Sequence, residues 1–142
     1  MAGINIGRSL AAVVAALLML GFIDQTLERT LVMTLANAPL QDEASYLAIR
    51  NRPGVLAFTV FTHALASLLT GYVLAKLAGS HEVQHAMVTA ALATMLVAFA
   101  SMTPNIMLPP VWVRVAMIFI TPPALIAGAY VRGQARSIRE GS

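Results

Sequence analysis

The chain has 142 residues, of which 58% are hydrophobic and 11% are charged, and its mean hydropathy is +0.78. Soluble proteins carry about a quarter charged residues, so this composition excludes a soluble domain and predicts a single transmembrane domain over 1–142. The net charge of +3 comes from basic residues scattered around apolar runs, which is typical of topology signals and not of nucleic-acid binding, and the absence of cysteine excludes disulfides and thiolate sites.

The first apolar segment is the uncharged run 9–23. It shares a basic start and an apolar stretch with signal peptides, but the nearest small-residue cleavage pattern lies well beyond it. A helical pattern continues past this run until Pro39 would end it. We therefore expect an uncleaved transmembrane helix over about 8–36, followed by a short amphipathic helix on the membrane surface over 42–49.

The second apolar segment, 55–75, carries no charge and predicts a transmembrane helix over about 54–78. At ~1.5 Å per residue such a run crosses a hydrocarbon core of ~30 Å. One face of this helix repeats every four residues, and all but its first member are small: His63, Ser67, Gly71, Ala75 and Gly79. Small residues let a second backbone come close, so we expect this stripe to pack against a helix and not against lipid.

Two further apolar segments predict transmembrane helices over about 81–103 and 110–132. Pro122 and Pro123 predict a kink in the last of them. Small residues at helical spacing give each helix a packing face: Ala86 and Ala90 in the third, Gly128 in the fourth. The sequence thus predicts an all-α, four-helix transmembrane bundle, and the basic C-terminal end favours a topology with both termini inside the cell.

Four fragments resemble a family of small bacterial four-helix integral membrane proteins to which no activity is assigned. These fragments are 71–78, 85–86, 108–112, and 121–124 with Gly128. In that family a Gly-Tyr pair ends the second span, an acidic residue sits high in the first, and a basic residue precedes the Gly-Tyr pair by about two turns. Asp24 and His63 fall at those places here, although the family more often has arginine where this chain has His63. The resemblance implies a four-helix topology in the bacterial cytoplasmic membrane.

Residues 81–85 read His-Glu-Val-Gln-His, which matches the pattern of zinc hydrolases with His81 and His85 as ligands and Glu82 as general base. A catalytic zinc needs a third protein ligand, and Glu140 is the one His, Asp or Glu that follows His85. The motif also falls at a helix start, where His81 and Glu82 would be exposed to water. We therefore expect no metal and no cofactor, and the sequence favours a non-enzymatic role.

Three ionisable residues fall inside the predicted spans: Asp24, His63 and Arg114. Counted along the helices, Asp24 and Arg114 lie ~7 Å below the outer edge of the hydrocarbon, and His63 lies ~14 Å below it. A charge at the centre of a span costs about 2.5–3.5 kcal/mol, so Asp24 should pair, either with Arg114 or with His63. Such a cluster is either a structural clasp between helices or a proton or ion relay.

The sequence carries three functional hypotheses. The first is an accessory or scaffolding subunit of a larger membrane complex or of a homo-oligomer, favoured by more small-residue faces than one four-helix bundle needs. The second is a small transporter or proton-relay bundle that uses Asp24, His63 and Arg114. The third is an intramembrane zinc protease that uses the segment 81–85. The expected partners are the lipid bilayer and other transmembrane subunits or copies of the chain.

Overall fold

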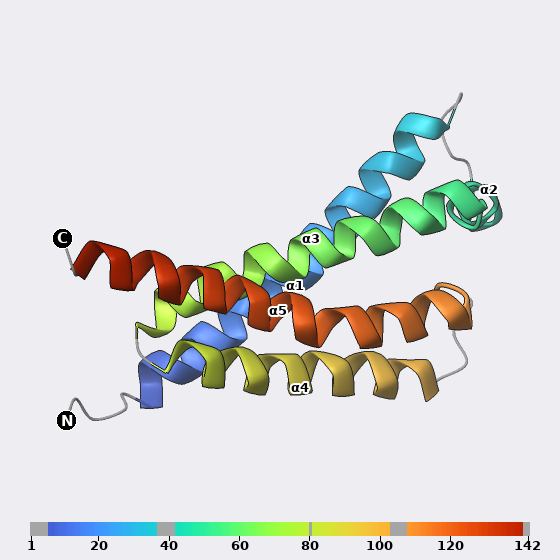
Figure 1. Cartoon of the computed structure of the whole chain (residues 1–142). Helices are drawn as coiled ribbons and strands as arrows, with labels where there is room; N and C mark the ends of the chain where they lie inside the picture. The colour runs from blue at the N-terminus through green and yellow to red at the C-terminus, as the bar shows by residue number, and fades with distance from the viewer. Residues whose placement is uncertain (1–5, 37–41, 80, 103–107, 141–142) are drawn as a thin grey trace.

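The computed structural model describes residues 6–36, 42–79, 81–102 and 108–140. The regular structure of this part of the chain is helical throughout: α1 Ile6–Leu35, α2 Glu43–Arg50, α3 Pro53–Ala78, α4 Glu82–Met102 and α5 Val111–Glu140 (Figure 1). All of these helices except the short α2 are long and apolar enough to cross a membrane. The prediction of an all-α bundle with four spans is confirmed.

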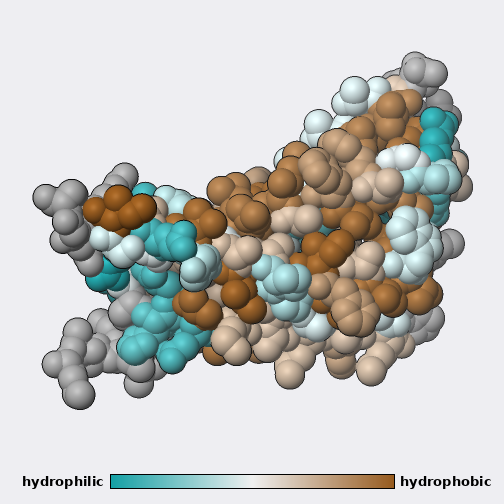
Figure 2. Space-filling model, viewed as in Figure 1, coloured by the Kyte–Doolittle hydropathy of each residue, from teal (hydrophilic) through white to brown (hydrophobic). Residues whose placement is uncertain are grey.

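The surface has the polarity of a multi-pass membrane protein. Figure 2 shows hydrophilic side chains gathered near the two termini and around α2, with hydrophobic side chains covering the middle of the molecule. Large apolar side chains are exposed on the long helices, among them Leu18, Phe22, Met95, Phe99 and Phe119. Soluble monomers do not expose contiguous apolar surface on this scale, so the middle zone is the one that faces lipid.

The helix ends follow the predicted spans closely, with one exception. The last helix was expected to end at about 132, whereas α5 continues to Glu140. Residues 133–140 are polar, so hydropathy ends the span before them, but they contain no proline to stop the helix. Arg136 also ties these turns to the bundle, because its Nη1 donates to the Gly79 carbonyl oxygen at 2.6 Å. Helix α5 continues through Pro122 and Pro123 as well.

Helix α3 lies at the centre of the bundle and contacts each of the other four helices. Its closest neighbour is α5, because two glycines bring the backbones together. A Cβ atom added to Gly71 would overlap the backbone carbonyl of Leu125, and one added to Gly128 would overlap that of Leu68. The α3–α5 crossing is therefore a backbone-to-backbone contact that no larger residue fits.

Candidate functional site

His63 lies on α3 inside the bundle and is hydrogen-bonded on both sides of its ring. Its Nδ1 lies 2.7 Å from Oδ2 of Asp24 on α1, and its Nε2 lies 2.7 Å from Oγ1 of Thr121 on α5. The residue is 4% exposed. One imidazole thus joins three of the four spans through two short hydrogen bonds.

The helical repeat of α3 places this ring in the interior. Thr59 and Ser67 lie one turn before and one turn after His63, and all three residues are buried. Along the helix axis His63 lies ~15 Å from Pro53 and ~22 Å from Ala78. A polar ring at this depth is beyond bulk water, so it needs partners from the protein on both sides.

The hydrogen bonds around His63 fit two protonation states of its ring. Nδ1 faces the carboxylate of Asp24, and a carboxylate only accepts, so Nδ1 donates to it. Thr121 has one hydroxyl proton, and its Oγ1 lies 2.6 Å from the Met117 carbonyl oxygen and 2.7 Å from Nε2 of His63. If the hydroxyl donates to Met117, Nε2 holds a second proton and donates to Oγ1; if the hydroxyl donates to Nε2, the ring is neutral. The same geometry accommodates an imidazolium or a neutral imidazole beside Asp24.

Asp24, at one end of this row of hydrogen bonds, lines a cavity of about 210 Å³. The Asp24 side chain is 24% exposed, in contrast to the closed-off ring of His63. The polar side chains of the cavity wall come from all five helices: Asp24, Gln25, Glu28, Arg50, Thr59, Ser101 and Arg114. At ~30 Å³ for each water molecule, the cavity has room for several waters or one small solute. Asp24 can therefore exchange a proton with water or a solute in the cavity.

Arg114 lies in the same cavity wall but does not pair with Asp24. Of the two partners predicted for Asp24, the structure has His63: the Asp24 carboxylate is bonded to that ring, and no ion pair joins it to Arg114 among the described residues. Nη1 of Arg114 instead donates to the Ser101 carbonyl oxygen at 3.3 Å, and its buried Nε has no hydrogen-bond partner among the described residues. Residue positions along the helices predict the same membrane depth for Asp24 and Arg114. They do not predict the direction in which each side chain points.

Of the small residues singled out in the sequence, Gly79 is half-buried at the C-terminal end of α3, and the other six are buried inside the bundle. Ser67, Gly71 and Ala75 are buried on α3, with Gly71 at the crossing with α5. The other three are buried on α4 and α5: Ala86, Ala90 and Gly128. One chain thus covers these faces by itself.

The segment 81–85 does not assemble into a metal centre in the described structure. His81 precedes α4 and is exposed, while Nδ1 of His85 donates to the His81 carbonyl oxygen at 2.9 Å. Within the described ranges no three His, Cys, Asp or Glu side chains converge as metal ligands. The expectation that Glu82 is exposed to water is wrong, because its side chain is 15% exposed and lies 3.7 Å from Nη1 of Arg136. The unexpected extension of α5 brings that arginine into reach.

Three residues of the site region were missed from the sequence: Thr121, Arg50 and Tyr46. Arg50 is 2% exposed and donates to the Leu108 carbonyl oxygen at 2.9 Å. The hydroxyl of Tyr46 on α2 donates to Oε1 of Glu28 on α1 at 3.0 Å. Burial, together with the nearby Glu28 charge, raises the pKa of Tyr46 to about 12. The signal that could have found Thr121 is a hydroxyl in the middle of an apolar span, directly before two prolines.

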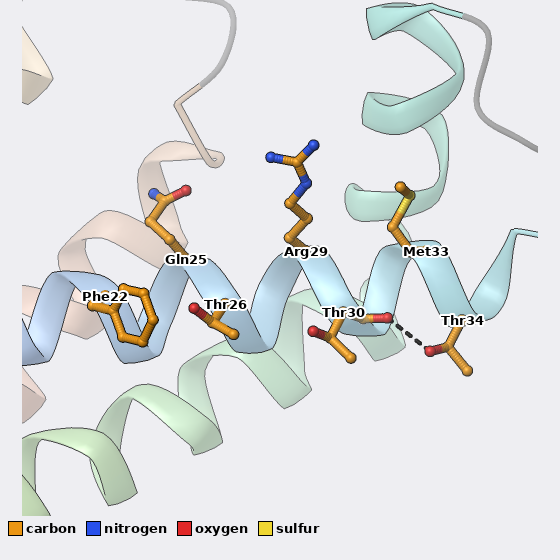
Figure 3. A pocket seen from close by; sticks show the side chains of 7 residues that line it. All are labelled: Phe22, Gln25, Thr26, Arg29, Thr30, Met33 and Thr34. Carbon is orange, nitrogen blue, oxygen red and sulfur yellow. Dashed lines mark hydrogen bonds between the residues drawn. The ribbon is translucent and has the colours of Figure 1, made fainter.

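A larger hollow of about 640 Å³ lies on the C-terminal half of α1 (Figure 3). All seven of its lining side chains come from this one helix, among them Gln25, Arg29 and Thr30. Side chains of a single helix cannot enclose a ligand, so we assign the site to the smaller cavity beside Asp24.

Comparisons of the chain with protein-family models, with curated proteins and with solved structures find no match. The resemblance to small bacterial membrane proteins therefore stays a prediction. The assignment of the site rests on the geometry around His63.

Proposed function

We propose that the chain is a small membrane transporter or proton-relay bundle whose working groups are Asp24 and His63. The observation that carries this proposal is the hydrogen-bonded chain from Asp24 through His63 to Thr121, which opens on a polar cavity at the Asp24 end. Ionisable groups inside a membrane are costly, and they commonly mark proton or ion pathways.

The proton transfer uses only the side chains of Asp24, His63 and Thr121. When the ring is an imidazolium, a proton that moves from Nδ1 of His63 to Oδ2 of Asp24 converts the ion pair into a neutral acid–imidazole pair, while Nε2 keeps its proton toward Thr121. Asp24 then releases that proton into the cavity. Two acceptors, Nδ1 and Oδ2, are left facing each other, so loss of the proton weakens the link between α1 and α3. Proton binding and helix contact are coupled in this way.

The relay is favoured over a scaffolding role by the way the small residues are used. A scaffold was suggested by a surplus of small-residue faces, yet Ser67, Gly71 and Ala75 are buried within this chain. The same holds for the small residues of α4 and α5, namely Ala86, Ala90 and Gly128. These faces require no partner, whereas a buried imidazole bonded to a carboxylate beside a polar cavity still requires an explanation.

The proposed location is the bacterial cytoplasmic membrane, with both termini in the cytoplasm. Arg8 near one end of the chain and Arg132 and Arg136 near the other support this orientation, because basic residues are enriched in cytoplasmic segments. The cavity lies at the α2 end of the bundle, opposite the two termini (Figure 1). It would therefore open toward the outside.

Proton flux into liposomes that contain the purified protein tests the proposal. Under an imposed pH gradient, the wild-type chain should acidify the lumen faster than empty liposomes do, and Asp24→Asn and His63→Gln should each remove most of this flux. His85→Gln is the matched control, since His85 is an imidazole outside the chain of hydrogen bonds to Asp24. Wild-type flux equal to that of empty liposomes would refute the relay.

A second candidate, an accessory subunit or homo-oligomer, is favoured by the outer half of α1. This half diverges from α4 and α5 (Figure 1), and its polar side chains at Thr26, Arg29 and Thr30 are exposed. A partner helix would cover them. A cysteine at Thr30 should then crosslink to a second chain or another subunit in native membranes, while a cysteine at the exposed apolar Leu18 should not. Equal crosslinking at both positions would count against this candidate.

A further inference from the structure

The charge of Arg114 is not balanced by any carboxylate that the structure describes. The chain has six acidic residues: Asp24, Glu28, Asp42, Glu43, Glu82 and Glu140. Asp24 is paired with His63, and Glu82 lies beside Arg136 at the far end of the bundle. Glu140 lies 140 − 114 = 26 residues further along the same helix, which is ~39 Å away.

Of the remaining acidic residues, Asp42 and Glu43 belong to α2 and its N-cap, and Glu28 lies on α1 beside α2. Asp42 accepts from the Ser45 amide at 2.7 Å as the N-cap of α2, and Glu43 is exposed in the first turn of that helix. Glu28 lines the cavity, but its Oε1 accepts from Tyr46 and it forms no ion pair with Arg114 in the described structure. Arg114 thus stands in the cavity wall with one weak bond, to Ser101, and with a buried Nε that has no partner there.

The two carboxylates that line the cavity are both engaged elsewhere. Helix α1 contributes these carboxylates, Asp24 and Glu28, while α2 contributes Arg50 and α5 contributes Arg114. Asp24 is bonded to His63 and Glu28 to Tyr46. The guanidinium of Arg114 therefore faces the cavity without an ion-pair partner among the described residues. An uncompensated charge in a low-dielectric site strongly attracts a counter-ion.

From this arrangement we propose that the cavity binds a small monovalent anion, chloride or a short carboxylate, at Arg114. The volume of about 210 Å³ admits an anion of this size together with water. The planar guanidinium of Arg114 carries charge-assisted N–H donors that suit either anion. Binding requires no movement of the Asp24–His63 pair.

Coupling between proton binding and anion binding would add to the proposed relay, and this part of the inference rests on it. A proton on the Asp24–His63 pair cancels the negative charge that Asp24 would otherwise present to an anion in the same cavity. Proton and anion should therefore strengthen each other's binding, and by linkage they should do so by the same factor. A proton-coupled carrier of small anions is the resulting class of transporter.

Equilibrium dialysis of the detergent-solubilised chain against radioactive chloride or acetate tests the site, with gluconate keeping the ionic strength constant. We expect saturable binding to the wild-type chain and at least about tenfold weaker binding to Arg114→Gln. Arg132→Gln, on the same helix at the opposite end of the bundle, is the matched control and should bind as the wild type does. No saturable binding of either anion to the wild-type chain, or unchanged binding to Arg114→Gln, would overturn the proposal.

A second variant decides the matter if Arg114→Gln does not fold. Arg114→Lys keeps the positive charge but loses the planar set of guanidinium donors, so weaker anion binding is expected, and unchanged affinity contradicts the assigned geometry. The experiments test the anion site and the proton relay independently. Anion binding without proton flux would remove the relay and leave the site, whereas proton flux without anion binding would remove the site and leave the relay.

Discussion

The two ends of the bundle use arginine in different ways. At the end that carries the termini, Arg8 donates to the Leu77 carbonyl oxygen at 2.7 Å and Arg136 to that of Gly79 at 2.6 Å. Both side chains satisfy carbonyl groups at the C-terminal end of α3, where the helix dipole also favours positive charge. At the α2 end, Arg114 lines a cavity beside the Asp24–His63 pair and has no carboxylate partner in the described structure. One end caps a helix, and the other holds the candidate site.

The interior differs between these ends as well. From the α2 end, polar groups reach inward as far as His63. Toward the termini, a cluster of small apolar side chains closes the bundle, and it includes Ala12, Ala16, Ala75 and Ala129. Polar side chains therefore extend from the α2 end of the bundle to its middle, but not from the end that carries the termini. A proton carrier built on His63 would have to open the alanine cluster to complete its cycle.

The largest expected effect is at the α3–α5 crossing, which keeps both ends in register. Gly71→Leu should cost at least about 3 kcal/mol of stability or abolish folding, because its side chain would meet the Leu125 backbone. Gly21→Leu is the control, since a Cβ atom at Gly21 has no neighbour within 4 Å. Thermal unfolding in detergent measures both changes. A stable Gly71→Leu variant would show that the two helices do not cross there.

The next effect is specific to the α2 end. Asp24→Ala and His63→Leu should each destabilise the bundle, and a double-mutant cycle should give a coupling of about 1–3 kcal/mol, because removing one partner leaves the other unpaired. The matched cycle of Asp24→Ala with Arg114→Leu should give less than about 0.5 kcal/mol. A stronger coupling in the second cycle than in the first would reverse the assignment of partners.

Thr121→Val should have a smaller effect on stability, about 1 kcal/mol, because it removes the hydroxyl that bonds Nε2 of His63 while keeping the shape of the side chain. Thr62→Val is the control, since the Thr62 hydroxyl bonds only backbone carbonyls of its own helix. Thr121→Ser keeps the hydroxyl and should restore the proton flux that Thr121→Val reduces. Wild-type flux in Thr121→Val would place Thr121 outside the relay.

The smallest effect concerns the link between α2 and α1. The pKa of Tyr46 in the folded chain, about 12, lies above the ordinary value of 10.0, so the Tyr46–Glu28 contact stabilises the fold below about pH 10 and loses its effect as the pH rises through about 12. Solvent screening limits the contribution to about 1 kcal/mol. Tyr46→Phe should be less stable than the wild type at pH 8, and the difference should vanish at strongly alkaline pH. A pH-independent difference would assign the effect to packing.

The sequence predicted the four spans because hydropathy and helix length depend on local composition. It also named Asp24 and His63 as a possible pair, since both are polar residues at similar depth in apolar helices. It did not choose between His63 and Arg114 as the partner of Asp24, because that choice depends on how α1 is rotated against α3. Depth along a helix is a local property, but rotation is set by packing between helices.

The same limit explains the other misses. Thr121 is one of many hydroxyl residues in the spans, and only the α3–α5 crossing at Gly71 brings it to Nε2 of His63. The pairing of Glu82 with Arg136 depends on the polar turns of α5 beyond the span, which hydropathy does not detect. Contacts between residues far apart in sequence were the part that local patterns could not supply.

The most direct test of the account is the hydrogen bonding of His63 in a lipid bilayer. Nitrogen-15 NMR of histidine-labelled protein carrying His81→Gln and His85→Gln would report on His63 alone, since the chain has three histidines. We expect Asp24→Asn to shift the Nδ1 resonance and Thr121→Val to shift the Nε2 resonance, because each substitution changes the partner of that nitrogen. Ring-nitrogen resonances that neither substitution moves would contradict the central claim.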